Sequence, residues 1–428
     1  MRVLMQYLRY TLILCICLAG TYVLFELVGS ARTPESLHCQ GCNVILISID
    51  TLGANHLSLY DPALSTTPFL ESIAKESFVF DNAYSQAPWT LPSHVSMLTG
   101  RYPWDLNIWL PSDVVLKDTL TLAEMLKEYG YETAAFSNGA FVRPGWGLDQ
   151  GFDEFYGSVA EKDWEDVPKI FNESLAWLQK RSDPEPFFLL IRPFETHDPY
   201  IENGESIEIQ EIAGENLRDG GPRASETDRY RELYRAEVTK TDAALKDFFE
   251  KLDSEGILDN TIVIITSDHG EEFGEHGTAG FHAVTLYQEL LHVPLIIWTP
   301  SEKDGRILDT VEVRSIPATI LDLVKLPANL TIGQSLVSRM EGIFKSDTTS
   351  LAATAMERET LLTNFLYGYG KSNLVPTPRT SEYTGRKSRS AIKGADQIIH
   401  NADGTQETFG TGADTPQMRD LLSHLENI

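Results

Sequence analysis

"NVILISID", residues 43–50, is a run of apolar, mostly β-branched residues that ends in an acid. A second run, "TIVIITSD" at 261–268, has the same form and also ends in an aspartate. Continuous apolar runs of this length are typical of strands buried on both faces, as in a parallel sheet. Similar runs at 131–137, 187–194 and 293–300 predict three more strands.

Helical patterns alternate with these strands. They cover 67–77, 119–130 and 167–181, and the pattern at 226–256 predicts one long amphipathic helix, or two helices separated by one break. Strands that alternate with helices predict an α/β fold, in which helices cover both faces of a large, mostly parallel but mixed sheet. The stretch at 202–226 is acidic, glycine-rich and aperiodic, which predicts a surface loop.

The texture of the chain changes near residue 345. Later residues alternate in polarity around "NADG" at 401–404, a hairpin turn signal, and a final pattern at 415–427 predicts a helix. We therefore predict a leader and linker at 1–42, an α/β catalytic domain at 43–345 and a small α+β subdomain at 346–428.

The chain is strongly acidic. Its 428 residues carry 62 acidic and 35 basic side chains, a formal net charge of −27. Such a surface repels nucleic acid and anionic membranes, so neither is an expected partner. It also repels small anionic substrates, so a metal ion or local cations must offset this field wherever an anion binds.

Membrane-like sequence occurs only near the N-terminus. Residues 10–25, "YTLILCICLAGTYVLF", are uncharged and mostly apolar, and Arg2 and Arg9 precede them. This pattern predicts a single N-terminal helix that anchors an otherwise extracytoplasmic protein, or a cleaved signal that releases a secreted or periplasmic one. A buried helix of the soluble fold is the third interpretation.

The four cysteines form two pairs. Cys15 and Cys17 lie inside the apolar run, where they are small hydrophobic side chains. Cys39 and Cys42 form a C-x-x-C motif just before the first strand, and in an exported protein this spacing predicts a local disulfide. A redox or metal-binding role is the alternative, and it lacks the second cysteine pair that many such sites use.

Polar residues follow three of the predicted strands. Asp50 and Asp268 are the last residues of their runs, and His197 comes just after the strand at 187–194. Ligands bind at the carboxyl ends of the strands in sheets of this kind. Acids in such positions also cap helices, but the joint occurrence of all three favours a site.

These residues have the chemistry of an open metal centre. Asp268 and the adjacent His269 offer an oxygen and a nitrogen to one cation, and Asp50 offers another carboxylate. Thr90 offers a hydroxyl whose pKa a bound metal would lower, which makes it a candidate nucleophile. A helix that begins near Pro92 would direct free N–H groups at the same point, which suits a phosphate or sulfate.

The chain resembles the sulfatase family of the alkaline phosphatase superfamily, from Asn43 to the C-terminus. The resemblance rests on seven blocks in the family's order: "NVILISIDTL", "WTLPSHVSMLTGRYP", "GYETAAFSN", "GLDQGFDEF", "THDPY", "SDHGEEFGEHG" and "TLYQELLHVPLII". It implies the family fold, a large sheet flanked by helices with a small C-terminal antiparallel sheet and a helix.

The resemblance also implies roles for individual residues. It assigns Asp50, Asp268 and His269 to the metal, with Thr90 beside it as the nucleophile. His197 corresponds to the histidine that contacts the substrate oxyanion or the leaving group. A further pair, His276 and His282, lies in the loop that closes over the site and is predicted to bind substrate.

Two family signatures are altered here. A sulfatase carries Cys or Ser within Cys/Ser-x-Pro-x-Arg and oxidises it to formylglycine, whereas this chain has "TLPSH" at 90–94. Threonine cannot yield the aldehyde, and His94 stands at the arginine position, as a further catalytic candidate or as a supporting group. The second signature begins as "GYET" at 130–133 but lacks the following lysine, and Asn138 lies near that position.

These departures favour an unmodified threonine nucleophile. Threonine beside a metal is found in phosphodiesterases and in phosphoglycerol and phosphoethanolamine transferases of the superfamily. We therefore predict a hydrolase of sulfate or phosphate (di)esters, with phosphoesters favoured, that uses one divalent ion. Histidine in the donor set favours Mn²⁺ or Zn²⁺, and Ca²⁺ is a further option. The substrate would be a small-molecule, glycan or lipid-headgroup ester; a headgroup transferase and a non-catalytic anion-binding protein are the alternatives.

Overall fold

The structure is a computed structural model, and the described residues are those whose placement is defined. They are 37–139, 141–158, 167–181, 185–202, 204–207, 224–276, 282–283, 285–301, 303–327, 333–342, 350–354, 388–393, 396–400 and 405–410. Contacts within the chain divide it into Met1–Leu37 and His38–Ile428. The fold described below belongs to the second of these units.

An eight-stranded sheet forms the centre of this unit, in the order β10-β2-β9-β8-β1-β5-β3-β4. All neighbouring strands are parallel except β9, which runs antiparallel to both β2 and β8. The strands are β1 (Asn43–Ile49), β2 (Ser77–Tyr84), β3 (Glu132–Asn138), β4 (Glu154–Ser158), β5 (Phe187–Arg192), β8 (Thr261–Ser267), β9 (Leu295–Trp298) and β10 (Gly305–Glu312). The predicted α/β fold with a mostly parallel, mixed sheet is confirmed.

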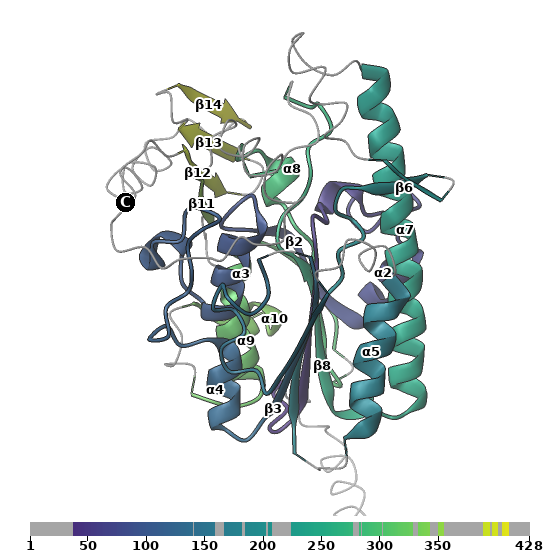
Figure 1. The fold of residues 1–428 in the computed structure, drawn as a ribbon, viewed down its shortest axis with the longest axis vertical. Helices are drawn as coiled ribbons and strands as arrows, with labels where there is room; N and C mark the ends of the chain where they lie inside the picture. Colours follow the sequence, from purple (N-terminus) through teal and green to yellow (C-terminus); the bar gives the residue numbers. More distant parts are fainter. Residues whose placement is uncertain are drawn as a thin grey trace, which may run out of the picture. The chain divides into compact units, whose positions relative to one another are not determined.

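Helices cover both faces of the sheet (Figure 1). One face carries α2 (Pro68–Ile73), α5 (Val167–Lys180) and α7 (Ala224–Ser254). The other carries α3 (Thr90–Thr99), α4 (Leu122–Glu128), α9 (Ile316–Leu323) and α10 (Val337–Met340). A short helix, α8 (Gln288–Leu291), and a two-stranded hairpin, β6 (Tyr200–Glu202) with β7 (Glu205–Ile207), lie outside these layers.

The central strands are buried because helices cover both of their faces. Every residue of β5 and β8 is buried, as are the last six of β1. The residues of these strands that face α5 and α7 form one apolar cluster with aromatic side chains of the two helices, among them Phe171 and Phe248, whose ring centroids lie 5.0 Å apart. Burial on both faces explains why these segments are continuous apolar runs rather than alternating ones.

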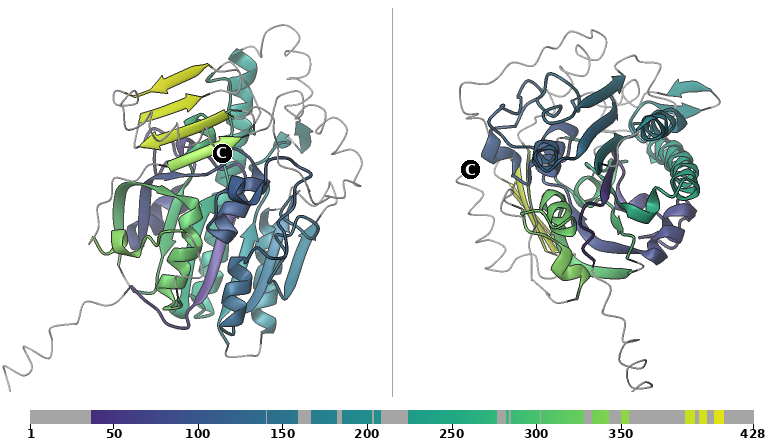
Figure 2. Two further views of the ribbon diagram at one scale, coloured as in Figure 1. Left: turned by 90° about the vertical axis from the view of Figure 1, so that its left-hand side faces the viewer. Right: turned by 90° about the horizontal axis from the view of Figure 1, so that it is seen from below.

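A second sheet is built from the C-terminal part of the chain. It has four antiparallel strands in the order β11-β12-β13-β14, shown side by side in Figure 2: β11 (Ser350–Thr354), β12 (Ser388–Lys393), β13 (Asp396–His400) and β14 (Gln406–Phe409). Ile392 and Ile399 of this sheet pack against Leu286 and Leu291 of the large domain. The predicted turn at 401–404 and the terminal helix at 415–427 lie outside the described residues.

Several elements differ from the sequence-based expectation. The long helix α7 is continuous over Ala224–Ser254, without the break that one interpretation allowed. The stretch expected to be a loop contains β7, which pairs with β6 as a hairpin. Strands β2, β4 and β10 were not predicted at all.

The N-terminal predictions are only partly addressed by the structure. Cys39 and Cys42 form the expected local disulfide. Within the described ranges, no helix has both the length and the apolar character needed to cross a membrane. The apolar run at 10–25 is outside those ranges.

Candidate active site

The two predicted metal-binding aspartates come together because their strands are neighbours. β1 and β8 pair in parallel, with Ile49 opposite Ser267, so Asp50 and Asp268 leave the same edge of the sheet side by side. His269 follows directly, and its Nε2 lies 3.6 Å from Asp50 Oδ1 and 3.6 Å from Asp268 Oδ2. All three side chains are fully buried.

Each aspartate makes its hydrogen bonds or ion pair through one oxygen, and its other oxygen has no hydrogen-bond partner among the described residues. Asp268 Oδ1 accepts hydrogen bonds from the backbone N–H groups of Thr51 (3.1 Å) and His269 (2.9 Å). Asp50 Oδ2 pairs with Arg192. The remaining atoms, Asp50 Oδ1 and Asp268 Oδ2, are buried without a hydrogen-bond partner among the described residues.

Thr90 joins this group as the first residue of α3. Its Oγ1 lies 3.4 Å from His269 Nε2, and the side chain is only 4% exposed. Ser93, one turn into the helix, donates a 2.7 Å hydrogen bond to the Asp268 backbone carbonyl, which ties the helix start to the end of β8. The helix begins two residues before Pro92, and its first N–H groups have no partner within the helix.

The charges of the two aspartates differ because their surroundings differ. Burial alone would raise the pKa of Asp50, but Arg192 and nearby histidines outweigh it and lower this pKa to about 2. Burial and the neighbouring Asp50 carboxylate raise the pKa of Asp268 well above its usual range. The two carboxylates therefore face each other, and within the described part of the chain only that of Asp50 has an arginine beside it.

Histidine rings line one side of the same space. His282 lies between two others, with ring centroids 4.5 Å from His269 and 5.0 Å from His197. The Nδ1 atoms of His269 and His197 each hydrogen-bond a backbone carbonyl, those of Gly270 (2.9 Å) and Asp198 (2.6 Å). An Nδ1–H held this way leaves Nε2 as the acceptor or ligand atom of each ring.

His282 differs from its neighbours because its Nδ1 pairs with a carboxylate rather than with a backbone carbonyl. Its Nδ1 lies 3.1 Å from Oε2 of the buried Glu271. Burial would lower the pKa of His282, but Glu271 outweighs burial and raises it. For His197 burial is the larger effect and lowers the pKa. The opposite shifts favour a protonated ring at His282 and a neutral ring at His197.

His94 contacts the backbone of Thr90 rather than its hydroxyl. The ring is fully buried; its Nδ1 donates to the Thr90 carbonyl (2.9 Å) and its Nε2 accepts from the Ser48 hydroxyl (3.1 Å). Burial lowers its pKa to about 3. With both nitrogens bonded and the ring neutral, the geometry favours the supporting interpretation of His94, because the ring joins α3 to β1.

His276 is not part of the group around Asp50. Its ring stacks on Tyr287 with centroids 3.5 Å apart, and its Nε2 lies 3.1 Å from Glu289 Oε2. Phe409 of the small sheet contacts the same ring at 5.8 Å. The structure thus places His276 where the small sheet meets the segment that follows His282.

Three residues of the site were not predicted from the sequence. Arg192 and Glu271 are the charged partners of Asp50 and His282. Thr51 adopts a left-handed backbone (φ 53°), which lets its N–H reach Asp268. A buried arginine at the end of an apolar strand run was a usable signal for the first of them, because charged groups are rarely buried without a partner.

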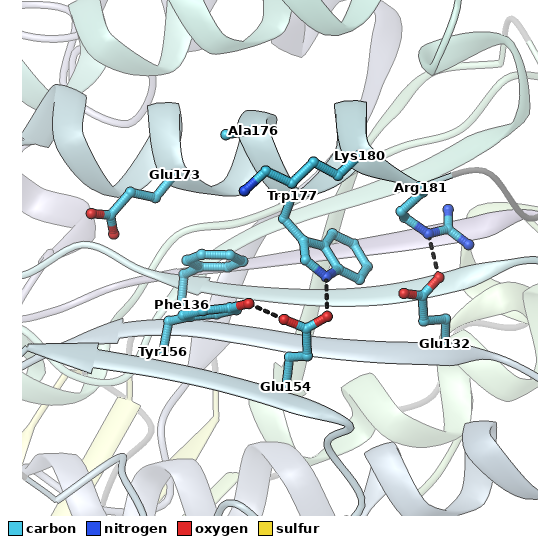
Figure 3. Close-up of a pocket in the computed structure, with 9 residues that line it drawn as sticks. All are labelled: Glu132, Phe136, Glu154, Tyr156, Glu173, Ala176, Trp177, Lys180 and Arg181. Atoms are coloured by element: carbon cyan, nitrogen blue, oxygen red, sulfur yellow. Dashed lines mark hydrogen bonds and ion pairs between the residues drawn. The ribbon is translucent and has the colours of Figure 1, made fainter.

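A separate cavity of about 370 Å³ opens at the far edge of the sheet, between α5 and β4 (Figure 3). The rings of Phe136 and Tyr156 stack in it, and Glu154 accepts hydrogen bonds from Trp177 Nε1 (3.2 Å) and from Tyr156. None of the predicted site residues lines this cavity. Its bonded polar groups attach α5 to the edge strand and provide no nucleophile beside a metal site.

The donor atoms at Asp50, Asp268 and His269 fit a divalent cation. They lie within 4.8 Å of one another, and they form the one such group of three or more among the described residues. Two buried, unpartnered carboxylate oxygens beside an imidazole nitrogen are costly without a cation and well suited to one.

The fold and this site define an α/β enzyme of the alkaline-phosphatase type, which acts on sulfate or phosphate esters. The chain belongs to the sulfatase family, whose model matches residues 42–326. Members of this family depend on a divalent metal ion, in agreement with the three grouped ligands. The protein is therefore an enzyme that hydrolyses sulfate or phosphate esters.

Individual relatives have low sequence identity to this chain, but the similarity covers most of its length. An ulvan-active sulfatase of Formosa agariphila is 25% identical over 424 residues, covering 90% of this chain and 78% of the relative. Arylsulfatase K of Rattus norvegicus is 24% identical over 380 residues, covering 74% and 66%. Among solved structures, a phosphonate monoester hydrolase from Silicibacter pomeroyi has a TM-score of 0.70 at 18% identity and covers 90% of this chain and 94% of its own.

Proposed function

We propose that the protein is a metal-dependent hydrolase of singly charged phosphate esters, with Thr90 as an unmodified nucleophile. The observation that carries this proposal is the convergence of four atoms: Thr90 Oγ1 and His269 Nε2, with the open oxygens of two buried aspartates. Asp50, Asp268 and His269 would hold the ion. When bound, the ion would lower the pKa of the threonine hydroxyl and attract the ester oxygens.

The protein groups then have distinct tasks. Thr90 Oγ1, whose proton passes to solvent, attacks phosphorus, the bond to the leaving alcohol breaks, and a phosphothreonine forms. His282, whose pKa is raised, donates a proton toward the leaving oxygen, and His197 accepts from or orients the substrate. Water then attacks phosphorus and returns a proton to His282, the bond to Oγ1 breaks, and Thr90 takes up a proton from solvent.

Phosphorus is favoured over sulfur by the chemistry of the second step. A formylglycine hydrate releases sulfate by breaking its own C–O bond, and threonine has no second hydroxyl that allows this. A sulfated threonine would have to be hydrolysed at sulfur, which is slow, whereas water or an alcohol readily attacks a phosphothreonine beside a metal.

The first prediction tests the nucleophile and the substrate together. The protein, loaded with Mn²⁺ or Zn²⁺, is assayed with an aryl phosphodiester and the matching aryl sulfate. We expect diester turnover that falls by roughly 10³-fold or more in Thr90→Ala, while Thr90→Ser, which keeps the hydroxyl, retains measurable turnover. Diester turnover that is unchanged in Thr90→Ala would exclude this nucleophile. Turnover of only the sulfate ester, dependent on Thr90, would reverse the preference for phosphorus.

We also infer that the enzyme works outside the cytoplasm. The Cys39–Cys42 disulfide supports this, because such bonds persist in oxidising compartments. As a second prediction, a reporter fused after residue 428 that is active only when exported will be active in the native host. Activity of a reporter that works only in the cytoplasm would contradict the inference.

A further inference from the structure

Arg192 is a charged residue buried at the centre of the site. It is the last residue of β5, which lies next to β1 in the sheet. The side chain is fully buried, and its guanidinium pairs with Asp50 Oδ2 and donates to the backbone carbonyl of Asn138. The guanidinium is therefore a cation placed directly beside a predicted metal ligand.

The surroundings are shaped to hold this cation. Its guanidinium lies over the ring of Phe194 at 5.5 Å. Gly139 has φ +83°, and a Cβ there would lie 2.4 Å from the Phe194 ring and 3.2 Å from Arg192 Nη1. Only a glycine therefore leaves room for both side chains, and the arginine occupies a defined place rather than filling space.

The charges of the centre are unevenly balanced without a metal. Asp50 and Asp268 are both fully buried, and the one arginine or lysine side chain paired with either of them among the described residues is Arg192. Through Oδ2 Asp50 faces this cation, and through Oδ1 it faces the open group with Asp268 and His269. A metal ion bound at that group would therefore share Asp50 with the arginine.

We propose that Arg192 is a built-in counter-ion of the metal centre, which keeps the centre folded when the ion is absent and lowers its affinity for the ion. The inference rests on the proposed metal site. A positive charge on the far side of a shared carboxylate repels a second cation. The same charge saves Asp50 from being buried unpaired, a state that strongly destabilises a fold.

The test compares stability and metal affinity in Arg192→Met. Without metal, in EDTA, we expect Tm to fall by about 5 °C. With saturating Mn²⁺ the fall is less than half as large, because the ion supplies the missing charge. Calorimetric titration of the folded variant with Mn²⁺ gives a Kd about tenfold lower than that of the natural protein. Arg192→Lys, which keeps the charge, stays within about threefold of the natural Kd.

The control is another arginine–carboxylate pair on the same domain. Arg181 lies 2.6 Å from Glu132 Oε2 and is only 10% exposed, but it stands in the cavity beyond α5 (Figure 3). Arg181→Met should lower Tm equally with and without metal and leave the Kd unchanged. The double variant Asp50→Asn with Arg192→Met provides a second check, because removing the carboxylate charge should make the loss of Arg192 cost less Tm than it does alone.

The outcomes separate this inference from the proposed function. If the natural protein binds neither Mn²⁺ nor Zn²⁺, the proposed metal site is wrong. If it binds metal, but Arg192→Met has an unchanged or higher Kd, or loses the same Tm with and without metal, the counter-ion role is wrong and Arg192 only packs. If Arg192→Met folds only with metal, the proposal is supported in its strongest form. If it folds in neither condition, Arg192→Lys and the double variant decide: a Lys variant that binds metal more than threefold differently, or a double variant as unfolded as the single, overturns the proposal.

Discussion

At the scale of single residues, Asp50 and Asp268 differ in how the protein balances their negative charge. Asp268 accepts backbone N–H groups on one oxygen, and its other oxygen lies near the rings of His94 and His269, at 3.5 and 3.6 Å. Asp50, in contrast, has the positive charge of Arg192 beside it. This asymmetry gives the two carboxylates opposite pKa shifts. The raised pKa of Asp268 therefore favours the protonated carboxyl in the metal-free centre, and a metal ion that binds through this group has to displace the proton.

The third prediction follows from this displacement. Since the folded pKa of Asp268 is raised above its ordinary 3.8, the metal-free folded state binds more protons than the unfolded chain, and its stability falls as pH rises from 3.8 through the raised value. Metal binding, which needs the carboxylate, strengthens over the same range. Asp50, with a pKa of about 2, stays charged throughout.

Calorimetry measures this linkage directly. Titration with Mn²⁺ at pH 5.5 and pH 7.5, each in two buffers of different ionisation enthalpy, should give a lower Kd at the higher pH and release of protons at the lower one. An affinity that does not change with pH, with no buffer-dependent heat, would show that Asp268 is already ionised in the metal-free protein.

At this scale the sequence indicated the ligands better than their partners. Asp50, Asp268 and His269 could be found because they end apolar runs, and the structure brings them together as expected. Arg192 could not be assigned to Asp50, because its contact depends on which strand lies beside β1. Glu271, which is buried against His282, could not be assigned to that histidine for the same reason: the contact depends on the folded path of the chain.

At the scale of elements, the small sheet supports the segment that follows the active-site loop. Gln397 of β13 donates a 2.9 Å hydrogen bond to Ser390 of β12 and another to the Leu286 carbonyl. Tyr287 donates to Glu407 of β14 at 2.9 Å. These contacts hold the chain only a few residues after His282, so the small sheet stabilises the position of that histidine.

The fourth prediction separates the two loop histidines. His282 lies among the rings beside Asp50, whereas His276 is stacked on Tyr287 and bonded to Glu289. His282→Ala should therefore lower kcat/KM by roughly 10²-fold or more, the usual effect of removing a proton-transfer group. His276→Ala should lower it less than tenfold, mainly through KM.

Steady-state kinetics with one aryl diester measures both effects, and circular dichroism confirms that both variants fold. Equal losses in the two variants would mean that His276 reaches the substrate after all. His276→Gln, which keeps a polar side chain of similar length, serves as the matched comparison for the stacking contact.

Element prediction succeeded where one face or both faces of a segment are uniform. β5 and β8 are buried throughout and β1 is buried after its first residue, so their apolar runs were clear. β10 lies at the edge of the sheet with a mixed burial pattern, and Leu308 within it is 71% exposed, so it lacks such a run. The direction of β9 was also beyond the sequence, because strand direction depends on the path of the connections rather than on composition.

At the scale of the whole molecule, the candidate site and the disulfide lie at opposite ends of strand β1. The Cys39–Cys42 disulfide precedes β1, and so does His38, which lies 3.2 Å from Asp322. Asp50 follows β1 directly. A strand of seven residues separates the disulfide from Asp50 by roughly 23 Å. The disulfide is therefore remote from the candidate metal-binding group.

The last prediction concerns the net charge of −27. This charge repels an anionic ester at long range, and salt screens that repulsion over about 10 Å at 0.1 M. The buried charges at Asp50 and Arg192 are screened much less, because solvent does not reach them. Raising sodium chloride from 20 to 200 mM should therefore increase kcat/KM for an anionic diester, by roughly two- to fivefold, through a lower KM with kcat unchanged. Potassium chloride at equal ionic strength should act identically. A fall in kcat/KM would mean that the substrate meets the local positive charge of the metal and Arg192 before it meets the acidic surface.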